Sequence, residues 1–410
     1  MKILVIGKGG REHALAHACS KSALCDRLYM APGNPGMAKL GTCVDISDGD
    51  VEGLVSFAKE KMIDLTIVGP EATLSKGVVD AFQKEGLKIF GPTKAATQVE
   101  SSKDFAKKIM AKYHIPTASY QTFDRYEDAV AYVKEKGAPI VIKEDGLKAG
   151  KGVTVAQKIS EALEALEVAF SQPGNKVVIE ECLVGFEFSL ICLVHNDQVV
   201  PLEIAQDHKC VNDGDTGPNT GGMGSYSPVK KITKEIIQNT MDTVMVPMAK
   251  AMMSEGVPFT GFLYGGLMLT KQGVKVIEFN ARFGDPEAEV ILPRLQSDFV
   301  QAILDVMDNK EVSLTWSDKV SHGVVMASTN YPASSTKGSL IEGVDQSDAL
   351  IYHMGTKEED GKLMTDGGRV LMVVTLEDTL EEAFAHTYRE VKKIHCKDLF
   401  YRHDIGKKDM

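Results

Sequence analysis

The sequence lacks the features that define several large classes of protein. Its 410 residues include seven cysteines, an odd number with no CxxC pair, so neither a disulfide framework nor a cysteine zinc site is expected. A reducing, cytoplasmic compartment fits this pattern best. No uncharged apolar run reaches the ~20 residues that span a bilayer. The first residues also lack the apolar stretch and cleavage site of a signal peptide.

A surplus of positive charge is also missing. The chain has 46 Lys and Arg against 57 Asp and Glu, a net charge of −11, which argues against a nucleic-acid partner. The negative net charge does not exclude small anionic substrates, because a few lysines and arginines close together can bind them in an otherwise acidic protein. The hydrophobic share of 43% and charged share of 25% are those of a folded globular protein. At ~100–200 residues per domain, the length predicts two to four domains.

Strands and helices alternate through the first hundred residues. The expected elements are strands at 1–7, 27–33, 65–70 and 88–92 and helices at 10–22 and 51–61. This order predicts a Rossmann-like parallel sheet, covered on both faces, in a substrate-binding domain of residues 1–100. Three of the strands end in glycine or proline turns. Ligands of open α/β sheets bind at that end of the strands, so the site of this domain should lie there.

The remaining chain predicts two further units, which makes the protein a multidomain chain of mixed α/β and α+β class. Residues 101–325 begin with a helix opened by a capping box of Ser101 and Asp104. Within a lid subdomain of about 117–190, two strands flank a glycine-rich turn and should pair antiparallel. A further helix is expected from about Thr233 to Met253. Residues 326–410 alternate again and predict a small C-terminal α/β domain.

The segment VIEFNAR at 276–282 is the sharpest candidate site. Residues two apart in a strand share a face, so Glu278, Asn280 and Arg282 should project together while Ile277 and its apolar alternates enter the core. A carboxylate and an amide oxygen suit Mg²⁺, and an arginine suits a carboxylate or a phosphate. The alternative is a solvent face with a simple Glu–Arg pair.

Glycines and lysines alternate in the turn GLKAGKG at 146–152. Glycines let backbone amides approach an anion, and lysines neutralise it, so the turn suits phosphate. It is no Walker A loop, because Gly152 follows Lys151 and a strand comes next. Lys143 ends the preceding strand, and Lys103 lies in a first helical turn, where the helix dipole disfavours a cation unless an anion is near. The alternative for each lysine is a solvated side chain.

Two other patterns mimic known sites incompletely. In GKGGREH, Gly7 and Gly9 fit a dinucleotide fingerprint, but Glu12 occupies the third glycine position and no acidic residue ends the second strand. The turn still suits a phosphate at a helix N-terminus. His13 and His17, four apart on that helix, have no third ligand to support zinc.

A long polar loop at 206–224 contains five glycines. Asp213 and Asp215 resemble the start of an EF-hand loop, but the later ligands and the flanking helices are absent. Long loops without secondary structure inside a domain are usually functional. We therefore expect an irregular substrate loop, with plain surface as the alternative.

Taken in order, these motifs resemble one family. GKGGREHALA, APGNPG, VGPEATLSKGVVD, KEDGLKAGKGV, DTGPNTGGMG and EFNARFGDPE are similar to segments of phosphoribosylamine–glycine ligases, also called glycinamide ribonucleotide synthetases, of the ATP-grasp superfamily. The resemblance covers essentially the whole chain. It implies an ATP-grasp domain at 101–325. It also implies a reaction in de novo purine biosynthesis, in which ATP, glycine and 5-phosphoribosylamine give glycinamide ribonucleotide, ADP and phosphate through glycyl phosphate.

The resemblance also implies roles for individual residues. Glu278 and Asn280 would hold Mg²⁺ or Mn²⁺. The implied ATP-binding residues are Lys103, Lys143, Gly150, Lys151, Gly152, Glu180, Glu181, Leu183 and Glu187. The implied phosphoribosyl contacts are Gly9, Gly10, Arg11, Glu12 and Asn34. The implied glycine contacts are Asp215, Gly221, Gly222, Gly224 and Arg282. Arg282, Asp215 and Lys143 would be catalytic through positioning and charge, with no protein nucleophile.

Some residues depart from the family pattern, and two other function classes stay open. The family commonly has Ala where this chain has Glu144 and Lys148, Glu at Phe186 and Gly at Asn330. The other classes are a non-catalytic nucleotide sensor on an ATP-grasp fold and a nicotinamide-dependent oxidoreductase, which only the GKGG turn suggests.

Overall fold

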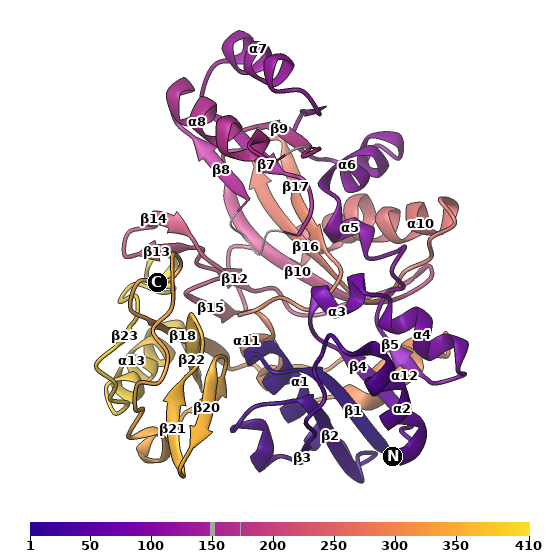
Figure 1. Cartoon of the computed structure of the whole chain (residues 1–410), viewed down its shortest axis with the longest axis vertical. Coiled ribbons are helices and arrows are strands. Elements are labelled where there is room, and N and C mark those ends of the chain that lie inside the picture. The colour runs from indigo at the N-terminus through magenta and orange to yellow at the C-terminus, as the bar shows by residue number, and fades with distance from the viewer. Residues whose placement is uncertain (148–151, 173) are drawn as a thin grey trace.

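The computed structural model describes residues 1–147, 152–172 and 174–410. Figure 1 shows the N-terminal sheet at the base, a lid of two helices on a small sheet at the top, and the C-terminal unit to one side. Among the described residues, none of the helices is both long and apolar enough to cross a membrane.

The N-terminal sheet is parallel throughout, with strand order β3-β2-β1-β4-β5. Its strands are β1 (Lys2–Gly7), β2 (Arg27–Pro32), β3 (Thr42–Cys43), β4 (Leu65–Val68) and β5 (Ile89–Phe90). Its helices are α1 (Gly10–Ser20), η1 (Met37–Lys39), α2 (Val51–Lys61), α3 (Glu71–Ser75) and α4 (Val78–Lys84). The predicted parallel sheet is confirmed. Among its five strands, β3 alone was not expected from the sequence.

Two helices connect this sheet to the next unit, and their boundary differs from the prediction. Residues 98–112 form α5 (Gln98–Ser101) and α6 (Lys103–Lys112). Ser101 ends α5, so the predicted capping box was wrong. Ser102 caps α6 instead, and its Oγ accepts a hydrogen bond from Phe105 N at 3.2 Å. Lys103 does lie in the first turn, where the carboxylate of Asp145 accepts from its backbone N at 2.6 Å.

The lid is an antiparallel sheet in the order β6-β9-β7-β8 under two helices. Its elements are β6 (Tyr120–Phe123), α7 (Tyr126–Lys136), β7 (Ile140–Glu144), β8 (Val153–Ala156), α8 (Ile159–Phe170) and β9 (Val177–Glu181). The antiparallel pairing of β7 with β8 confirms the prediction for the strands on either side of the glycine-rich turn.

The central sheet has the order β11-β10-β16-β17 and is antiparallel. Its strands are β10 (Phe186–His195), β11 (Gln198–Pro201), β16 (Thr260–Thr270) and β17 (Gly273–Asn280). A bulge in β17 places Glu278 opposite Gly266 and Val276 opposite Leu267, so Ile277 is the extra residue. The helical segment predicted from Thr233 to Met253 is confirmed. It consists of α9 (Lys234–Thr240), a π-helical turn η2 (Met241–Met245) and α10 (Val246–Ser254).

The C-terminal sheet recruits strands from the expected substrate loop. Its order is β12-β15-β18-β22-β19, with β23 on β18. The strands are β12 (Gln206–Asp207), β15 (Gly224–Ser227), β18 (Val320–Ser328), β19 (Leu350–His353), β22 (Arg369–Glu377) and β23 (Leu399–Phe400). The prediction of a loop without secondary structure was wrong, because a hairpin of β13 (Cys210–Asn212) and β14 (Thr216–Asn219) lies between β12 and β15. The domain boundary expected after residue 325 falls inside β18.

The remaining helices and strands of the described residues follow in chain order. They are α11 (Ala288–Ile291), η3 (Leu292–Arg294), α12 (Phe299–Met307), η4 (Val344–Gln346), β20 (Thr356–Glu359), β21 (Lys362–Thr365), α13 (Leu380–Val391) and η5 (Lys407–Asp409).

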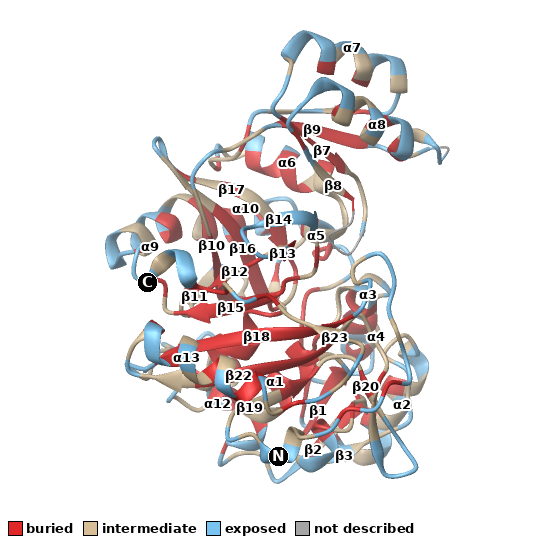
Figure 2. Ribbon diagram, turned by 90° about the vertical axis from the view of Figure 1, so that its left-hand side faces the viewer, coloured by how far each residue is buried: buried red, intermediate tan, exposed pale blue. Residues whose placement is uncertain are grey.

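An aromatic cluster joins the N-terminal sheet to the central sheet. The ring of Phe262 on β16 lies 5.0 Å from Phe90 on β5, 5.0 Å from Phe283 and 6.3 Å from Phe299 on α12. Figure 2 shows buried residues continuing from β1 through β18 and β22. The two units and the C-terminal sheet therefore share one apolar core.

His322 on β18 is fully buried in this body. Its ring Nε2 lies 2.9 Å from the carbonyl oxygen of Ile405, and its Nδ1 lies 2.8 Å from Thr387 Oγ1. Burial lowers the pKa of His322 to about 4. In the unfolded chain this histidine has a pKa near 6.5. Between about pH 6.5 and pH 4, the unfolded chain therefore binds a proton at His322 that the folded chain does not bind. This group therefore lowers the free energy of unfolding progressively as pH falls from about 6.5 towards about 4.

We expect His322→Asn to weaken the acid sensitivity of the fold. The wild type should lose roughly 2 kcal/mol between pH 7 and pH 5 through this one group, and the variant should not. Urea unfolding at the two pH values measures the difference, with His114→Asn at an exposed histidine as the control. Equal losses in wild type and His322→Asn would contradict the assignment.

Candidate active site

A cleft of about 970 Å³ lies where the N-terminal sheet, the lid, the central sheet and the C-terminal unit meet. It brings together most of the residues singled out from the sequence. Those that line it are Gly9, Arg11, Glu12, Lys103, Lys143, Gly152, Glu180, Glu181, Leu183, Glu187, Asp215, Gly221, Glu278, Asn280 and Arg282. Gly150 and Lys151 lie outside the described residues. Ile277 also lines the cleft, so the prediction that it enters the core was wrong, and the bulge in β17 is the reason.

Two buried lysines hold Glu180 at the lid end of the cleft. Lys143 Nζ lies 3.0 Å from both carboxylate oxygens of Glu180, and Lys107 Nζ lies 3.0 Å from one of them. Lys143 also donates to the carbonyl oxygen of Ile277 at 2.9 Å, which ties the lid to the central sheet. Burial lowers the pKa of Lys107 to about 8, although Glu180 opposes the shift. The three side chains carry one net positive charge when both lysines are protonated.

Glu278 lies among ammonium groups that come from three different segments. Burial alone would raise the pKa of Glu278, but Lys209, Lys143 and Lys103 outweigh burial and lower it. Lys209 Nζ lies 4.0 Å from Glu278 and forms a close ion pair with Glu187. Glu278 is therefore ionised near neutral pH, and its surroundings favour additional negative charge.

Asn280 and Glu278 fit a magnesium ion that also takes oxygens from another ligand. Hydrogen bonding favours the orientation in which the Asn280 amide nitrogen donates to Glu100 Oε1 at 3.2 Å and to Phe279 O at 3.3 Å. Asn280 and Glu278 both line the cleft. In the described part of the chain, no group of three or more His, Cys, Asp or Glu could hold a metal. Mg²⁺ is commonly held by one or two protein oxygens plus phosphates, which matches this pair.

Arg282 is held by two carboxylates. Its Nη2 lies 3.1 Å from Glu100 on α5, and its Nε lies 3.4 Å from Glu71 at the start of α3. Although burial opposes the charge, these acids raise the pKa of Arg282. Burial would also raise the pKa of Glu71, but Arg282 and Arg11 lower it to about 2. Arg282 thus also has a structural role that the sequence did not indicate, because its ion pairs connect α3 and α5 to the end of β17.

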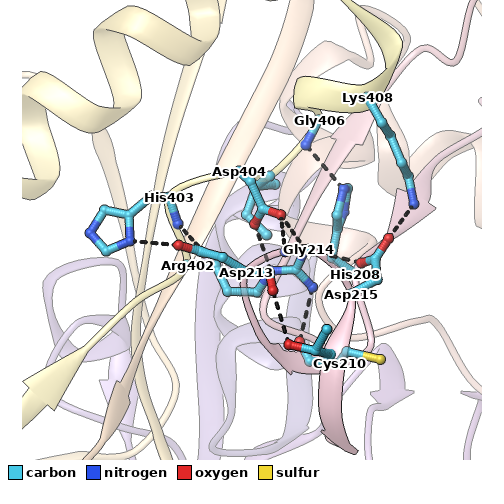
Figure 3. A network of polar contacts seen from close by, with 12 residues as sticks. His208, Cys210, Asp213, Gly214, Asp215, Arg402, His403, Asp404, Gly406 and Lys408 are labelled. Carbon is cyan, nitrogen blue, oxygen red and sulfur yellow. Dashed lines mark hydrogen bonds and ion pairs between the residues drawn. The ribbon is translucent and has the colours of Figure 1, made fainter.

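Asp215 is paired with the end of the chain. Its two oxygens lie 3.0 Å from Arg402 Nη2 and 3.0 Å from Lys408 Nζ, as Figure 3 shows. Burial opposes ionisation, but both cations lower the pKa of Asp215. Arg282 and Asp215 line the same cleft, although each is bonded to other groups.

The predicted loop glycines divide into two kinds. Gly221 lines the cleft, and its carbonyl oxygen accepts from Arg369 Nη1 at 2.8 Å. Gly224 is instead buried in β15, where an added Cβ would lie 2.6 Å from the carbonyl oxygen of Gly323 on β18. A Cβ at Gly222 would lie 2.4 Å from Pro286. Close packing therefore explains the need for glycine at 222 and 224.

The glycine turn before α1 is filled by a glutamate of the chain itself. Glu12 is buried and accepts from Gly9 N at 2.7 Å and from Arg11 Nε at 2.5 Å. An added Cβ at Gly7 or Gly69 would collide with the Glu12 side chain, at 2.4 Å and 2.0 Å. Glu12 thus replaces the third glycine of a dinucleotide fingerprint, which leaves no room there for a pyrophosphate.

A smaller cavity of about 260 Å³ adjoins this turn. From the N-terminal sheet it receives Lys8, Gly9, Gly10 and Asn34. Its opposite wall comes from the C-terminal unit and includes Thr356, Asp366, Gly367, Gly368 and Arg369. Asn34 connects the two walls, since its Nδ2 donates to the carbonyl oxygens of Lys8 at 2.8 Å and His353 at 2.9 Å.

The histidines of α1 lie beside this junction. His13 Nδ1 accepts from His353 N at 2.9 Å, and His17 Nδ1 lies 3.2 Å from Tyr352 Oη. Both histidines therefore contact the C-terminal unit.

Several residues of the site were missed from the sequence. Lys107 lies four residues after Lys103 on α6, and that helical spacing was a usable signal. Lys209 and Arg369 gave no such signal, because their neighbours in space are distant in sequence. The structure also bears on two residues that depart from the family pattern. The ring of Phe186 lies 4.5 Å from Lys231 Nζ. Asn330 has a φ of 72°, a conformation that glycine adopts readily.

We expect Arg282→Met to lower the free energy of unfolding by about 3 kcal/mol, because it leaves the buried Glu100 without its cation and Glu71 with Arg11 alone. A second change, Glu100→Gln, should restore part of that loss. Lys275→Met, which removes the more exposed pair between Lys275 on β17 and Glu181 on β9, should cost less than about 1 kcal/mol. Urea unfolding measures all three. Equal losses for Arg282→Met and Lys275→Met would contradict the buried network.

Comparison with known proteins agrees with the arrangement of the chain. Models of the phosphoribosylglycinamide synthetase N domain, ATP-grasp (A) domain and C domain match residues 1–100, 101–288 and 321–408. The phosphoribosylamine–glycine ligase of Halalkalibacterium halodurans is 51% identical over 415 residues, covering 100% of this chain and 97% of that protein. That of Lactococcus lactis subsp. lactis is 50% identical over 408 residues, covering 99% of each.

A solved structure has the same fold over its whole length. The crystal structure of phosphoribosylamine–glycine ligase from Thermotoga maritima superposes with a TM-score of 0.85 at 32% sequence identity, covering 99% of this chain and 100% of that one. Together with the family models, these likenesses establish that the chain belongs to the phosphoribosylglycinamide synthetase family of ATP-grasp ligases.

Proposed function

We propose that the cleft is the active site of a ligase that joins glycine to 5-phosphoribosylamine at the expense of ATP, giving glycinamide ribonucleotide, ADP and phosphate. The observation that carries the proposal is the convergence of Lys103, Lys143 and Lys209 on Glu278 beside Asn280. Cations around one ionised carboxylate suit a polyphosphate bound together with a divalent metal. Membership of the family supports the same reaction.

The ATP site would run from the lid to β17. We place the base beside Glu180, Glu181 and Leu183, with Glu187 near the ribose. Lys103, Lys143 and the turn at Gly150, Lys151 and Gly152 would hold the phosphates. Glu278 and Asn280 would hold Mg²⁺ or Mn²⁺, which when bound would neutralise charge that develops on the phosphates.

The reaction needs no protein nucleophile. A carboxylate oxygen of glycine attacks the γ-phosphorus, the bond to ADP breaks, and glycyl phosphate forms. The amine nitrogen of 5-phosphoribosylamine then attacks the glycyl carbonyl carbon, phosphate leaves, and the nitrogen loses a proton. The side chains contribute by placing the reactants and by stabilising charge. In this proposal Arg282 and Gly221 face the glycine carboxylate, and the ionised Asp215 faces its ammonium.

The smaller cavity would bind the phosphoribosyl group. Lys8 and Arg369 supply positive charge, and the backbone amide of Gly10 begins α1, where a phosphate is favoured. Thr356 and Asp366 offer partners for sugar hydroxyls. The C-terminal wall extends the site beyond the residues expected from the sequence, and Arg11 and Glu12 would shape its floor.

We also propose that the enzyme works in the cytoplasm on small molecules, without nucleic acid or a membrane. All the cysteines of the chain fall within the described residues and are free, which suits a reducing compartment.

We expect Glu278→Gln to abolish turnover, because it removes a charged ligand of the proposed metal while keeping the shape of the side chain. The rate of phosphate release from ATP, with glycine and 5-phosphoribosylamine both present, measures the effect, and circular dichroism reports the fold. Glu255→Gln, far from the cleft on the surface pair with Lys112, should keep the wild-type rate. An unchanged rate in Glu278→Gln would remove the metal assignment. Wild-type protein that binds MgATP without releasing phosphate would indicate a nucleotide sensor instead.

We expect Lys8→Met to raise the KM for 5-phosphoribosylamine roughly 10- to 100-fold, the equivalent of one charge-assisted hydrogen bond. The KM for ATP should change less than about twofold, since Lys8 follows β1 of the N-terminal sheet whereas Lys143 lies on β7 of the lid. Lys39→Met, an exposed lysine on η1, serves as the control. A rise in the KM for ATP instead would place the phosphoribosyl group elsewhere.

A further inference from the structure

The last residues of the chain fasten the hairpin that forms one wall of the cleft. We call the segment Arg402–Lys408 the C-terminal strap. Figure 3 shows it lying along residues 208–215, more than 180 residues away in the sequence. The strap donates and accepts hydrogen bonds along this whole stretch, which includes the β13–β14 turn.

Arg402 is the centre of these contacts and is almost completely buried. Its Nη1 donates to the carbonyl oxygen of Cys210 at 2.9 Å, and its Nη2 donates to Asp215 Oδ1 at 3.0 Å. Asp404 holds the guanidinium from the other side, at 2.8 Å from Nε and 2.9 Å from Nη2. Asp404 also accepts from Gly214 N at 2.7 Å. A buried guanidinium with these partners fixes the hairpin relative to the strap.

The strap anchors both chain neighbours of Lys209. On one side, Gly406 N donates to His208 Nε2 at 3.0 Å. On the other side, the carbonyl oxygen of Cys210 accepts from Arg402. Lys209 itself extends into the cleft, where it forms its ion pair with Glu187 and lies 4.0 Å from Glu278. The strap therefore holds the chain on both sides of Lys209, while Thr220 holds the carbonyl oxygen of Lys209 itself at 2.8 Å.

We propose that the C-terminal strap is a positioning device for the reaction, in which Arg402 sets the place of Lys209 beside Glu187 and Glu278. Lys209 pairs with Glu187 and offsets part of the charge of Glu278, so the two carboxylates repel the polyphosphate less. Arg402 touches no reacting atom and acts through the backbone of Cys210. This inference rests on the proposed function of the cleft and adds the end of the chain to it.

A kinetic double-mutant cycle separates positioning from plain stability. We expect Arg402→Met and Lys209→Met each to lower kcat at least tenfold, and the double variant to be no slower than Lys209→Met alone. Arg402→Lys should recover part of the rate. Arg389→Met, an exposed arginine of the same unit on α13, should behave as wild type. Additive losses in the double variant would overturn the proposal, because they would show that Arg402 acts independently of Lys209.

Hydrogen exchange tests the strap without any turnover. In Arg402→Met, amides of residues 208–216 should exchange at least tenfold faster than in wild type, while those of the lid stay unchanged. If Arg402→Met does not fold, His208→Met against His208→Gln takes its place, since the glutamine keeps an acceptor for Gly406 N. The proposal would be overturned if the exchange rates of residues 208–216 did not change in Arg402→Met. It would also be overturned if His208→Met and His208→Gln raised these rates equally.

The same cycle run on MgADP affinity distinguishes this inference from the proposed function. Coupling between Arg402 and Lys209 in MgADP binding supports the strap even if glycine is not the substrate. If wild-type phosphate release requires both substrates but MgADP binding shows no such coupling, the ligase function is supported and the positioning role of the strap is rejected.

Discussion

The arrangement of the cleft depends on lysine ammonium groups placed around two carboxylates, Glu180 and Glu278. Lys143 is the shared member: it pairs with Glu180, lowers the pKa of Glu278, and donates to the carbonyl oxygen of Ile277. One side chain from the lid thus connects two acids and the central sheet. Because buried charges are costly unless they are paired, these groups constrain where β7, β9 and β17 can lie. The bulge at Ile277 is part of this arrangement, since it presents that carbonyl to Lys143.

The charge of the cleft is opposite to that of the whole chain. The net charge is −11, yet Lys103, Lys107, Lys143 and Lys209 gather in one place. Two of them reach the site from α6, one from the lid and one from the polar hairpin segment. Their mutual repulsion is relieved by Glu180, Glu187 and Glu278, and a polyphosphate would relieve it further. An acidic protein can in this way bind anionic substrates without a basic surface.

Sequence reasoning identified the local features and missed the pairings between distant segments. The parallel N-terminal sheet and the antiparallel strands β7 and β8 followed from periodicity and turns, and both are confirmed. The helix cap at Ser102 was misplaced by one residue, because Ser101 and Ser102 offer the same chemistry. The face of Ile277 was wrong because a bulge leaves no mark in the alternation of one strand. The pairing of Asp215 with Arg402, and the wall that Arg369 adds to the smaller cavity, join residues more than 140 apart in sequence. Such contacts cannot be read from spacing.

The central claim is that the cleft joins glycine to an amine by first transferring a phosphoryl group to the glycine carboxylate. Glycine labelled with ¹⁸O in both carboxylate oxygens tests this directly, in a reaction with MgATP and 5-phosphoribosylamine analysed by mass spectrometry. The account predicts one ¹⁸O atom in each released phosphate and one in the amide carbonyl of the product, because a carboxylate oxygen attacks the γ-phosphorus and leaves with it. Product formed with unlabelled phosphate would contradict the account.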